Sequence, residues 1–146
     1  MSVPPTLLDS DTLSELARGH PRVAQAARGY LLHHGRLTVS AVTVFERLRG
    51  YRSAIGRGKP FELHLRRFVA FSATCVVLAV DARVADHASV IWAGVGARAR
   101  GALLDLLIVA TASANSLQIA TRNLRDFEVL ARAAPATVAL VDWAKS

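Results

Sequence analysis

The stretch Leu103–Leu130, LLDLLIVATASANSLQIATRNLRDFEVL, decides the fold of this chain. It begins with an acid, Asp105, followed by an apolar run without a polar face, which is typical of a buried helix. Leu117–Ala120 is a predicted short strand, and a second acid, Asp126, opens the next helix. In an open parallel sheet, strand ends and helix starts meet along one edge, where ligands bind. Two acids at neighbouring positions on that edge form a candidate cation site.

A structural role is the alternative for both acids. Aspartate is among the commonest helix N-cap residues, and such a cap stabilises a helix by about 1 kcal/mol. Asp105 and Asp126 are therefore either N-caps or members of a site at the sheet edge.

Strands and helices alternate along the rest of the chain, as expected for βα units. The predicted strands are Thr6–Asp9, Arg36–Ser40, Cys75–Val80, Leu117–Ala120 and Ala136–Val141. The main predicted helices are Val23–His34, Ala41–Gly50, Phe61–Ala73, Arg83–Arg100 and those that begin near Asp9, Asp105 and Asp126. This order predicts an α/β fold over residues 1–146 as a single domain, with a mainly parallel five-stranded sheet flanked by helices.

Two further acids fall close to the predicted sheet edge. Asp9 ends the first predicted strand, before the helix cap. Glu46 follows the second strand, and its position has two interpretations. With Thr43 it has the spacing of a capping box. If Ser40 is the cap instead, Glu46 lies in the second helical turn and can face the sheet edge.

The positive charge of the chain is concentrated in one segment. The formal net charge is +7, and residues 47–67 contain seven cations but only one acid, Glu62. The seven cations are Arg47, Arg49, Arg52, Arg57, Lys59, Arg66 and Arg67. Such clustering predicts a phosphate-rich partner, with a solvated helix face and loop as the alternative. The Gly-rich part, Ser53–Pro60, lacks the pattern of a P-loop and is expected to be a mobile loop.

The composition argues against several other classes of protein. Apolar residues make up 52% of the chain, which favours a folded core over disorder. Asp105, Ser113 and Asn115 interrupt the longest apolar runs, so we expect no membrane span. The first residues lack the features of a signal peptide. The one cysteine, Cys75, is expected to be a buried thiol in a cytoplasmic protein.

The four acids stand in contexts that resemble the PIN domain, and more closely the VapC-type toxins of bacterial toxin–antitoxin pairs. LLDSDTLSEL resembles the first motif of the family, with Asp9 as its acid. SAVTVFERLRG resembles the second, with Glu46. DLLIVATASANSLQIATRNLRDFEVL resembles the third and fourth, with Asp105 and Asp126.

Three polar residues accompany these acids in the resemblance. Asp11 stands where the family commonly has Asn, while Thr121 and Asn123 occupy matching places in the fourth motif. The chain departs from the family in the apolar segment Gly101–Leu104 before the third acid and in the bulky Phe45 beside the second. Neither departure removes an acid.

The resemblance implies a PIN-like three-layer sandwich and a metal-dependent endoribonuclease that leaves a 5′-phosphate and a 3′-hydroxyl. Asp9, Asp105 and Asp126 would be the metal ligands, and Glu46 would be a ligand or a base that orients water. Thr121, Asn123 and Asp11 would support them, and the seven cations of residues 47–67 would bind the RNA backbone. A small antitoxin and a second copy of the chain are the expected partners.

The residue types favour Mg²⁺ or Mn²⁺ as the metal. Four converging carboxylates repel one another, and a divalent cation relieves that repulsion. Oxygen ligands favour Mg²⁺ or Mn²⁺ over zinc, and no cluster of cysteine and histidine residues competes for the ion.

Two other readings remain open at this stage. A phospho-receiver domain also has a parallel five-stranded sheet and an acidic Mg²⁺ pocket, and Asp81 could be its phospho-acceptor. It needs a lysine after the last strand, however, and Lys145 lies too near the chain end. A catalytically inactive PIN-like module that only binds RNA or protein is the second reading.

Overall fold

The computed structural model describes residues 3–145, and its one sheet contains five short strands. These strands are β1 (Thr6–Leu8), β2 (Thr38–Ser40), β3 (Val76–Leu78), β4 (Gln118–Ala120) and β5 (Leu140–Val141). Every pairing between them is parallel, and their spatial order is β3-β2-β1-β4-β5. The predicted α/β class with a parallel five-stranded sheet is confirmed.

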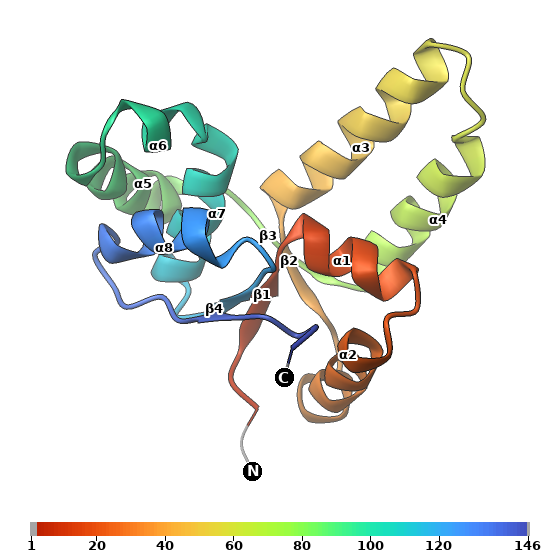
Figure 1. Cartoon of the computed structure of the whole chain (residues 1–146), viewed down its shortest axis with the longest axis horizontal. Helices are drawn as coiled ribbons and strands as arrows, with labels where there is room; N and C mark the ends of the chain where they lie inside the picture. Colours follow the sequence, from red (N-terminus) through yellow and green to blue (C-terminus); the bar gives the residue numbers. More distant parts are fainter. Residues whose placement is uncertain (1–2, 146) are drawn as a thin grey trace.

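Helices cover both faces of this sheet within the described residues (Figure 1). The helices are α1 (Ser10–Ala17), α2 (Pro21–His34), α3 (Ala41–Gly56), α4 (Glu62–Ala73), α5 (Ala82–Gly94), α6 (Ala97–Gly101), α7 (Leu103–Ala114) and α8 (Leu124–Arg132). Figure 1 shows α5 to α8 on one side of the sheet and α1, α2 and α4 on the other, which gives three layers. No helix within residues 3–145 has the length and apolar character needed to cross a membrane.

The side chains of the central strands alternate between the two faces of the sheet, and each face has its own hydrophobic core. Successive side chains of a strand point to opposite faces. Leu7 and Ile119 therefore belong to the core beneath α5, α7 and α8, whereas Leu8 and Ala120 belong to the core beneath α1 and α2. All four are fully buried.

Helix α7 is the buried helix that its apolar run predicts. Leu106 and every residue from Ile108 to Ala114 are buried, and α7 packs most extensively on α5. A helix buried on all sides can begin only where its polar first turn reaches an edge of the molecule. Asp105 lies in that first turn.

Two predicted helix boundaries are wrong. Helix α3 continues through Gly50 to Gly56, because Ala54 is buried and Tyr51 packs on Phe68 of α4. The first half of the predicted mobile loop Ser53–Pro60, up to Gly56, is therefore helical. The single predicted helix Arg83–Arg100 is two helices, α5 and α6, separated by two residues with extended backbone.

Strand β3 lies at an edge of the sheet and is shorter than predicted. The apolar run Cys75–Val80 led us to expect a strand covered on both faces, but only Val76–Leu78 pair, and Val77 is 42% exposed. Periodicity cannot distinguish a central strand from an edge strand of equal apolarity. Cys75 is a buried free thiol, as expected.

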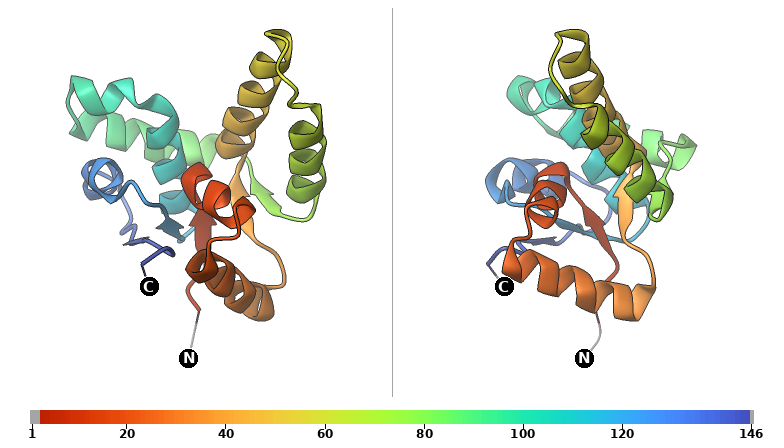
Figure 2. Two further views of the ribbon diagram at one scale, coloured as in Figure 1. Left: turned by 45° about the vertical axis from the view of Figure 1, so that its right-hand side comes forward. Right: turned by 90° about the vertical axis from the view of Figure 1, so that its right-hand side faces the viewer.

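The pair α3 and α4 projects from the body as an arm (Figures 1 and 2). The two helices pack on one another, and both views of Figure 2 show their connecting loop far from the sheet. The arm, defined as residues 41–73, carries most of the clustered positive charge.

The core around α7 gives a simple stability prediction. Ile108→Ala should lower the free energy of unfolding by about 2–5 kcal/mol, because Ile108 is fully buried and its removal leaves a cavity. Leu32→Ala removes a similar side chain that is 87% exposed, and should change stability by less than about 0.5 kcal/mol. Urea melts of both variants test this, and equal losses would contradict the assigned core.

Candidate active site

The strand order creates one crevice at the carboxyl ends of β1 and β4. Strand β2 pairs with one side of β1, and β4 pairs with the other side. The direction in which the strands are added to the sheet therefore reverses between β1 and β4. Ligands of open α/β sheets bind at such a switch point. A phospho-receiver sheet has the order 2-1-3-4-5 and places its site elsewhere, so this topology excludes that reading. Asp81 instead caps α5 through the backbone N–H of Val84.

Asp9 and Thr121 meet in this crevice. Asp9 follows β1, and its backbone N–H donates to the carbonyl of Ala120 at 3.0 Å. Thr121 follows β4, and its hydroxyl donates to Asp9 Oδ2 at 3.0 Å. The other carboxylate oxygen, Oδ1, accepts from the backbone N–H of Ser10 at 2.8 Å, which makes Asp9 the N-cap of α1. The acid is thereby fixed in one orientation.

Asp11 and Asn123 complete the hydrogen bonds around Thr121. Asp11 Oδ2 accepts from the backbone N–H of Arg122 at 3.0 Å and lies 3.4 Å from the Thr121 hydroxyl. The backbone N–H of Asn123 donates to the same hydroxyl at 3.1 Å. The turn after β4 is therefore held against the first turn of α1.

Asp105 and Asp126 are not N-caps. The cap positions of α7 and α8 are Ala102 and Asn123, and neither makes a side-chain cap hydrogen bond. Both acids lie in the first turn of their helices, where the helix dipole favours negative charge. Burial raises the pKa of Asp105, and the charges of Asp126 and Asp11 raise it further. Asp126 and Asp11 therefore both lie within electrostatic reach of Asp105.

Glu46 lies on the site side of α3. Ser40 caps this helix through the backbone N–H of Val42, so the capping box with Thr43 is wrong. Burial and the neighbouring charge of Asp105 raise the pKa of Glu46, while Arg49 lowers it. Thr43, three residues earlier on the same face, has a buried hydroxyl without a hydrogen-bond partner in the described chain.

Among the acids of the site, Asp9 has the pKa that is raised furthest above its ordinary value. Its pKa is raised to about 7, first by burial and then by the charges of Asp11 and, more weakly, Asp105. The hydrogen bonds from Ser10 and Thr121 act in the opposite direction but do not restore the ordinary value. The cluster thus carries more negative charge than its surroundings compensate.

The residues fit a divalent cation by their chemistry. All the clustered donors are oxygens, and no ion pair within residues 3–145 joins Asp9, Asp11, Glu46, Asp105 or Asp126 to a cation. Among these residues no three acidic, histidine or cysteine side chains converge closely enough to form a ready coordination site. The fold therefore gathers the charges at one edge without bringing their oxygens into a single coordination shell.

Comparison with known proteins agrees with this geometry. The sequence model of the PIN domain matches residues 6–133. The chain belongs to the PIN domain family. Members of this family are nucleases, which accounts for an acidic cluster at the switch point.

Several solved structures have the same fold as this chain. DNA-bound VapBC of Salmonella typhimurium superposes with a TM-score of 0.72 at 24% identity, covering 97% of this chain and 99% of that one. FitAcB of Neisseria gonorrhoeae gives a TM-score of 0.72 at 28% identity over 94% and 97%. A toxin–antitoxin complex of Klebsiella pneumoniae gives 0.61 at 23% over 84% and 89%. The curated proteins contain no match to this PIN domain.

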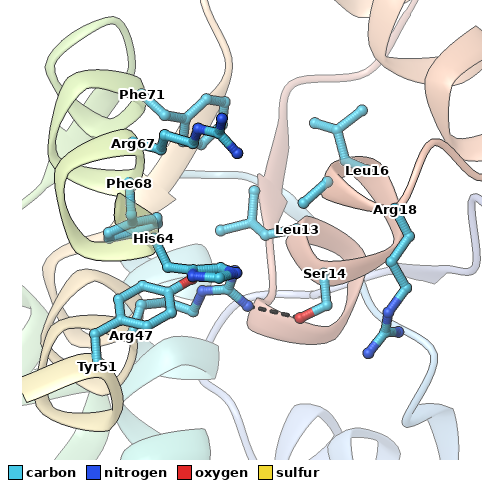
Figure 3. A pocket seen from close by; sticks show the side chains of 11 residues that line it. Leu13, Ser14, Leu16, Arg18, Arg47, Tyr51, His64, Arg67, Phe68 and Phe71 are labelled. Carbon is cyan, nitrogen blue, oxygen red and sulfur yellow. Dashed lines mark hydrogen bonds between the residues drawn. The ribbon is translucent and has the colours of Figure 1, made fainter. Parts of the chain in front are cut away.

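Arg47 is partly buried, unlike the other six cations of residues 47–67, and its side chain contacts α1 and α4 (Figure 3). Its guanidinium donates to Ser14 Oγ at 2.6 Å and to the Tyr51 hydroxyl at 3.0 Å, and it lies over the Phe68 ring. The remaining six cations of the segment are exposed. Sequence alone did not distinguish Arg47, although its position next to Glu46 places it one residue from the site.

Two arginines near the acids were missed by the sequence interpretation. Arg98 on α6 and Arg125 on α8 line a cavity that also contains Asp105 and Asp126. The available signal was the adjacency of Arg125 to Asp126 in the first turn of a helix. Nothing in the local sequence brings Arg98 to the same place, because that depends on the break between α5 and α6.

The raised pKa of Asp9 predicts how stability depends on pH in the absence of metal. Between the ordinary value of 3.8 and about 7, the folded protein keeps a proton that the unfolded chain has released. The free energy of unfolding should therefore fall, by a few kcal/mol at most, as pH rises through this window. Glu46 and Asp105 act in the same direction.

Melts in EDTA from pH 4 to pH 8 measure this dependence. Asp9→Asn should flatten the curve, since it removes the largest contribution. Asp86→Asn, an exposed acid on α5, should leave the slope unchanged. Parallel curves for the parent and Asp9→Asn would contradict the assigned environment of Asp9.

Proposed function

We propose that this PIN domain is a metal-dependent endoribonuclease that hydrolyses RNA phosphodiester bonds and acts as the toxin of a toxin–antitoxin pair. The observation that carries the proposal is the buried Asp9, with its pKa of about 7, among acids that form no ion pair within residues 3–145. Such a cluster at the starts of several helices suits a divalent cation and a phosphate group. Family membership supports the nuclease chemistry.

The proposed metal ligands are the carboxylates of Asp9, Asp105 and Asp126. When bound, Mg²⁺ or Mn²⁺ supplies a water of lowered pKa and neutralises charge on the reacting phosphate. Glu46 is a further ligand or the base that orients the attacking water. Thr121 orients Asp9 through its donated hydrogen bond, and Asp11 braces the turn through Arg122. The Asn123 side chain is available to hold a ligand or phosphate.

The arm is proposed to bind the RNA backbone. Its exposed cations are Arg49, Arg52, Arg57, Lys59, Arg66 and Arg67. Because these side chains are exposed, their contacts with phosphate would be electrostatic and independent of sequence. Arg47 would support the arm from within rather than contact RNA, because it is already bound to Ser14 and Tyr51.

The first functional prediction concerns Asp105→Asn. The variant should lose RNA cleavage by about two orders of magnitude or more, because the reacting phosphate loses charge stabilisation. Its stability without metal should hold or rise, since one repelling charge is removed from the cluster. The melting temperature should also respond less to added Mn²⁺, because ligand-linked stabilisation follows occupancy.

Asp81→Asn is the matched control. Asp81 also lies at a helix start, and asparagine caps about as well as aspartate, so this variant should cleave RNA like the parent. A cleavage time course and paired melts with and without Mn²⁺ measure both properties. Full activity of Asp105→Asn with an unchanged Mn²⁺ response would remove Asp105 from the proposed site.

The second functional prediction concerns the tip of the arm. Replacing Arg57 and Lys59 together with Gln should weaken binding of all RNAs about equally and reduce the slope of log affinity against log salt by one to two units. The same double change at Arg22 and Arg28, on α2, should leave the slope unchanged. Anisotropy titrations in EDTA at several salt concentrations give both slopes. Identical slopes for the two double variants would show that the arm does not bind RNA.

A groove between α1 and the arm supports an acidic antitoxin segment as the partner (Figure 3). The cavity is about 750 Å³. Leu13 and Leu16 of α1 face Phe68 and Phe71 of α4 across it, and no acid lines it. Its cations are Arg18, Arg47 and Arg67. An amphipathic segment with apolar and acidic side chains complements this lining. The Klebsiella and Neisseria complexes are consistent with such a pairing.

We also propose a homodimer acting in the cytoplasm, as is usual for toxins of this type. Two large apolar side chains, Val90 and Trp92, remain exposed on α5. An inactive PIN-like binding module remains the alternative, because no three side chains of residues 3–145 form a ready metal site. The cleavage assay described above decides between the two.

A further inference from the structure

A second cavity adjoins the acids on the side opposite the arm. It has a volume of about 420 Å³ and lies between α6, α8 and the start of α7. Asp105 and Asp126 form part of its lining, so a molecule bound there touches the same carboxylates as the proposed cation. Cavities of this size accommodate small ligands rather than a folded partner.

Two arginines of the cavity have no hydrogen-bond or ion-pair partner among residues 3–145. Neither Arg98 nor Arg125 makes a hydrogen bond or an ion pair with any described residue. Nearby arginines differ in this respect: Arg100 donates to the Trp92 carbonyl, and Arg132 pairs with Glu128. Free guanidinium groups beside an acidic site leave two forked donors available to a phosphate.

The rest of the lining is aliphatic. Ala99 and Ala102 form one wall, and Val129 and Leu130 form the other. Small side chains at the first wall keep the cavity open, and Val129 is 49% exposed and thus accessible. A cavity of about 420 Å³ suits a small planar group such as a single nucleobase rather than a nucleic-acid duplex.

We propose that this cavity binds the unpaired nucleotide next to the scissile phosphate of the RNA. Arg98 and Arg125 bind the phosphate of that nucleotide, and the exposed Val129 contacts its base. The inference rests on the proposed function, and it gives the enzyme a preference at one position beside the cut. The arm, by contrast, contacts backbone without reading sequence.

Two variants separate the contributions of charge and shape. Replacing Arg98 and Arg125 together with Gln should raise KM for a single-stranded RNA by 10- to 100-fold while changing kcat less. Val129→Phe fills the cavity without changing charge, and should shift which nucleotides flank the cut in a random-sequence RNA. The control for the double arginine variant is Arg22→Gln with Arg28→Gln on α2. The control for Val129→Phe is Val69→Phe on α4, because Val69 is 48% exposed.

Binding of a fluorescent six-nucleotide RNA in EDTA tests whether the cavity binds a nucleotide, independently of cleavage. Both cavity variants should bind this probe more weakly than their controls, and a duplex probe should bind equally to all. A parent that binds with this pattern but cleaves no RNA would remove the proposed function and keep the subsite.

Three outcomes overturn the subsite. One is a parent that cleaves RNA while both cavity variants match their controls in KM, cleavage position and binding. Another is preferential loss of duplex binding. The third is a change in sedimentation of Val129→Phe with RNA binding intact, which would make the cavity an interface between copies of the chain.

Discussion

The parallel pairing of β1 with β4 is the constraint on which the rest of the molecule depends. Leu7 lies opposite Ile119 and Leu8 opposite Ala120, and the hydrogen bond from the Asp9 N–H to the Ala120 carbonyl extends this register by one step. A slip of one residue would exchange the side chains of the two cores and turn Asp9 away from the edge. The packing that selects the register therefore also orients the acid.

The N-termini of three helices reduce the electrostatic repulsion among the acids at this edge of the sheet. Asp9 caps α1, while Asp105 and Asp126 lie in the first turns of α7 and α8, so each carboxylate faces the positive end of a helix dipole. Thr12 strengthens the arrangement, because its buried hydroxyl donates to the carbonyl of Ala120 and ties α1 to β4. The helix dipoles offset part of the repulsion between the acids, and the raised pKa values of Asp9, Glu46 and Asp105 show that part of the electrostatic cost remains.

The sequence predicted those features that depend on local pattern. The five parallel strands, the buried α7 and the end of α2 at Gly35, which adopts a φ of +78°, follow from apolar runs and a C-cap glycine. Asp9 and Thr121 follow the two strands that meet at the switch point, so their proximity was foreseeable.

Features that depend on tertiary packing were not predictable. The extension of α3 to Gly56 arises from contacts with α4, and the placement of β3 at the edge arises from strand order. The N-cap interpretation of Asp105 and Asp126 failed for a similar reason, since cap positions differ by a few residues from the acids that draw attention. Arg47 and Arg98 owe their positions to contacts between distant segments.

The sheet order also governs when the site can exist during synthesis. Asp9 and Thr121 are joined by a hydrogen bond across 112 positions of sequence, and β5, which pairs with β4, lies near the end of the chain. A nascent chain emerging from a ribosome folds its earlier parts first. The acids of α1 and α3 are synthesised before those of α7 and α8, which follow at least three of the five strands in the sequence. A nascent chain that does not yet contain Thr121 and Asp126 therefore has no assembled acidic cluster.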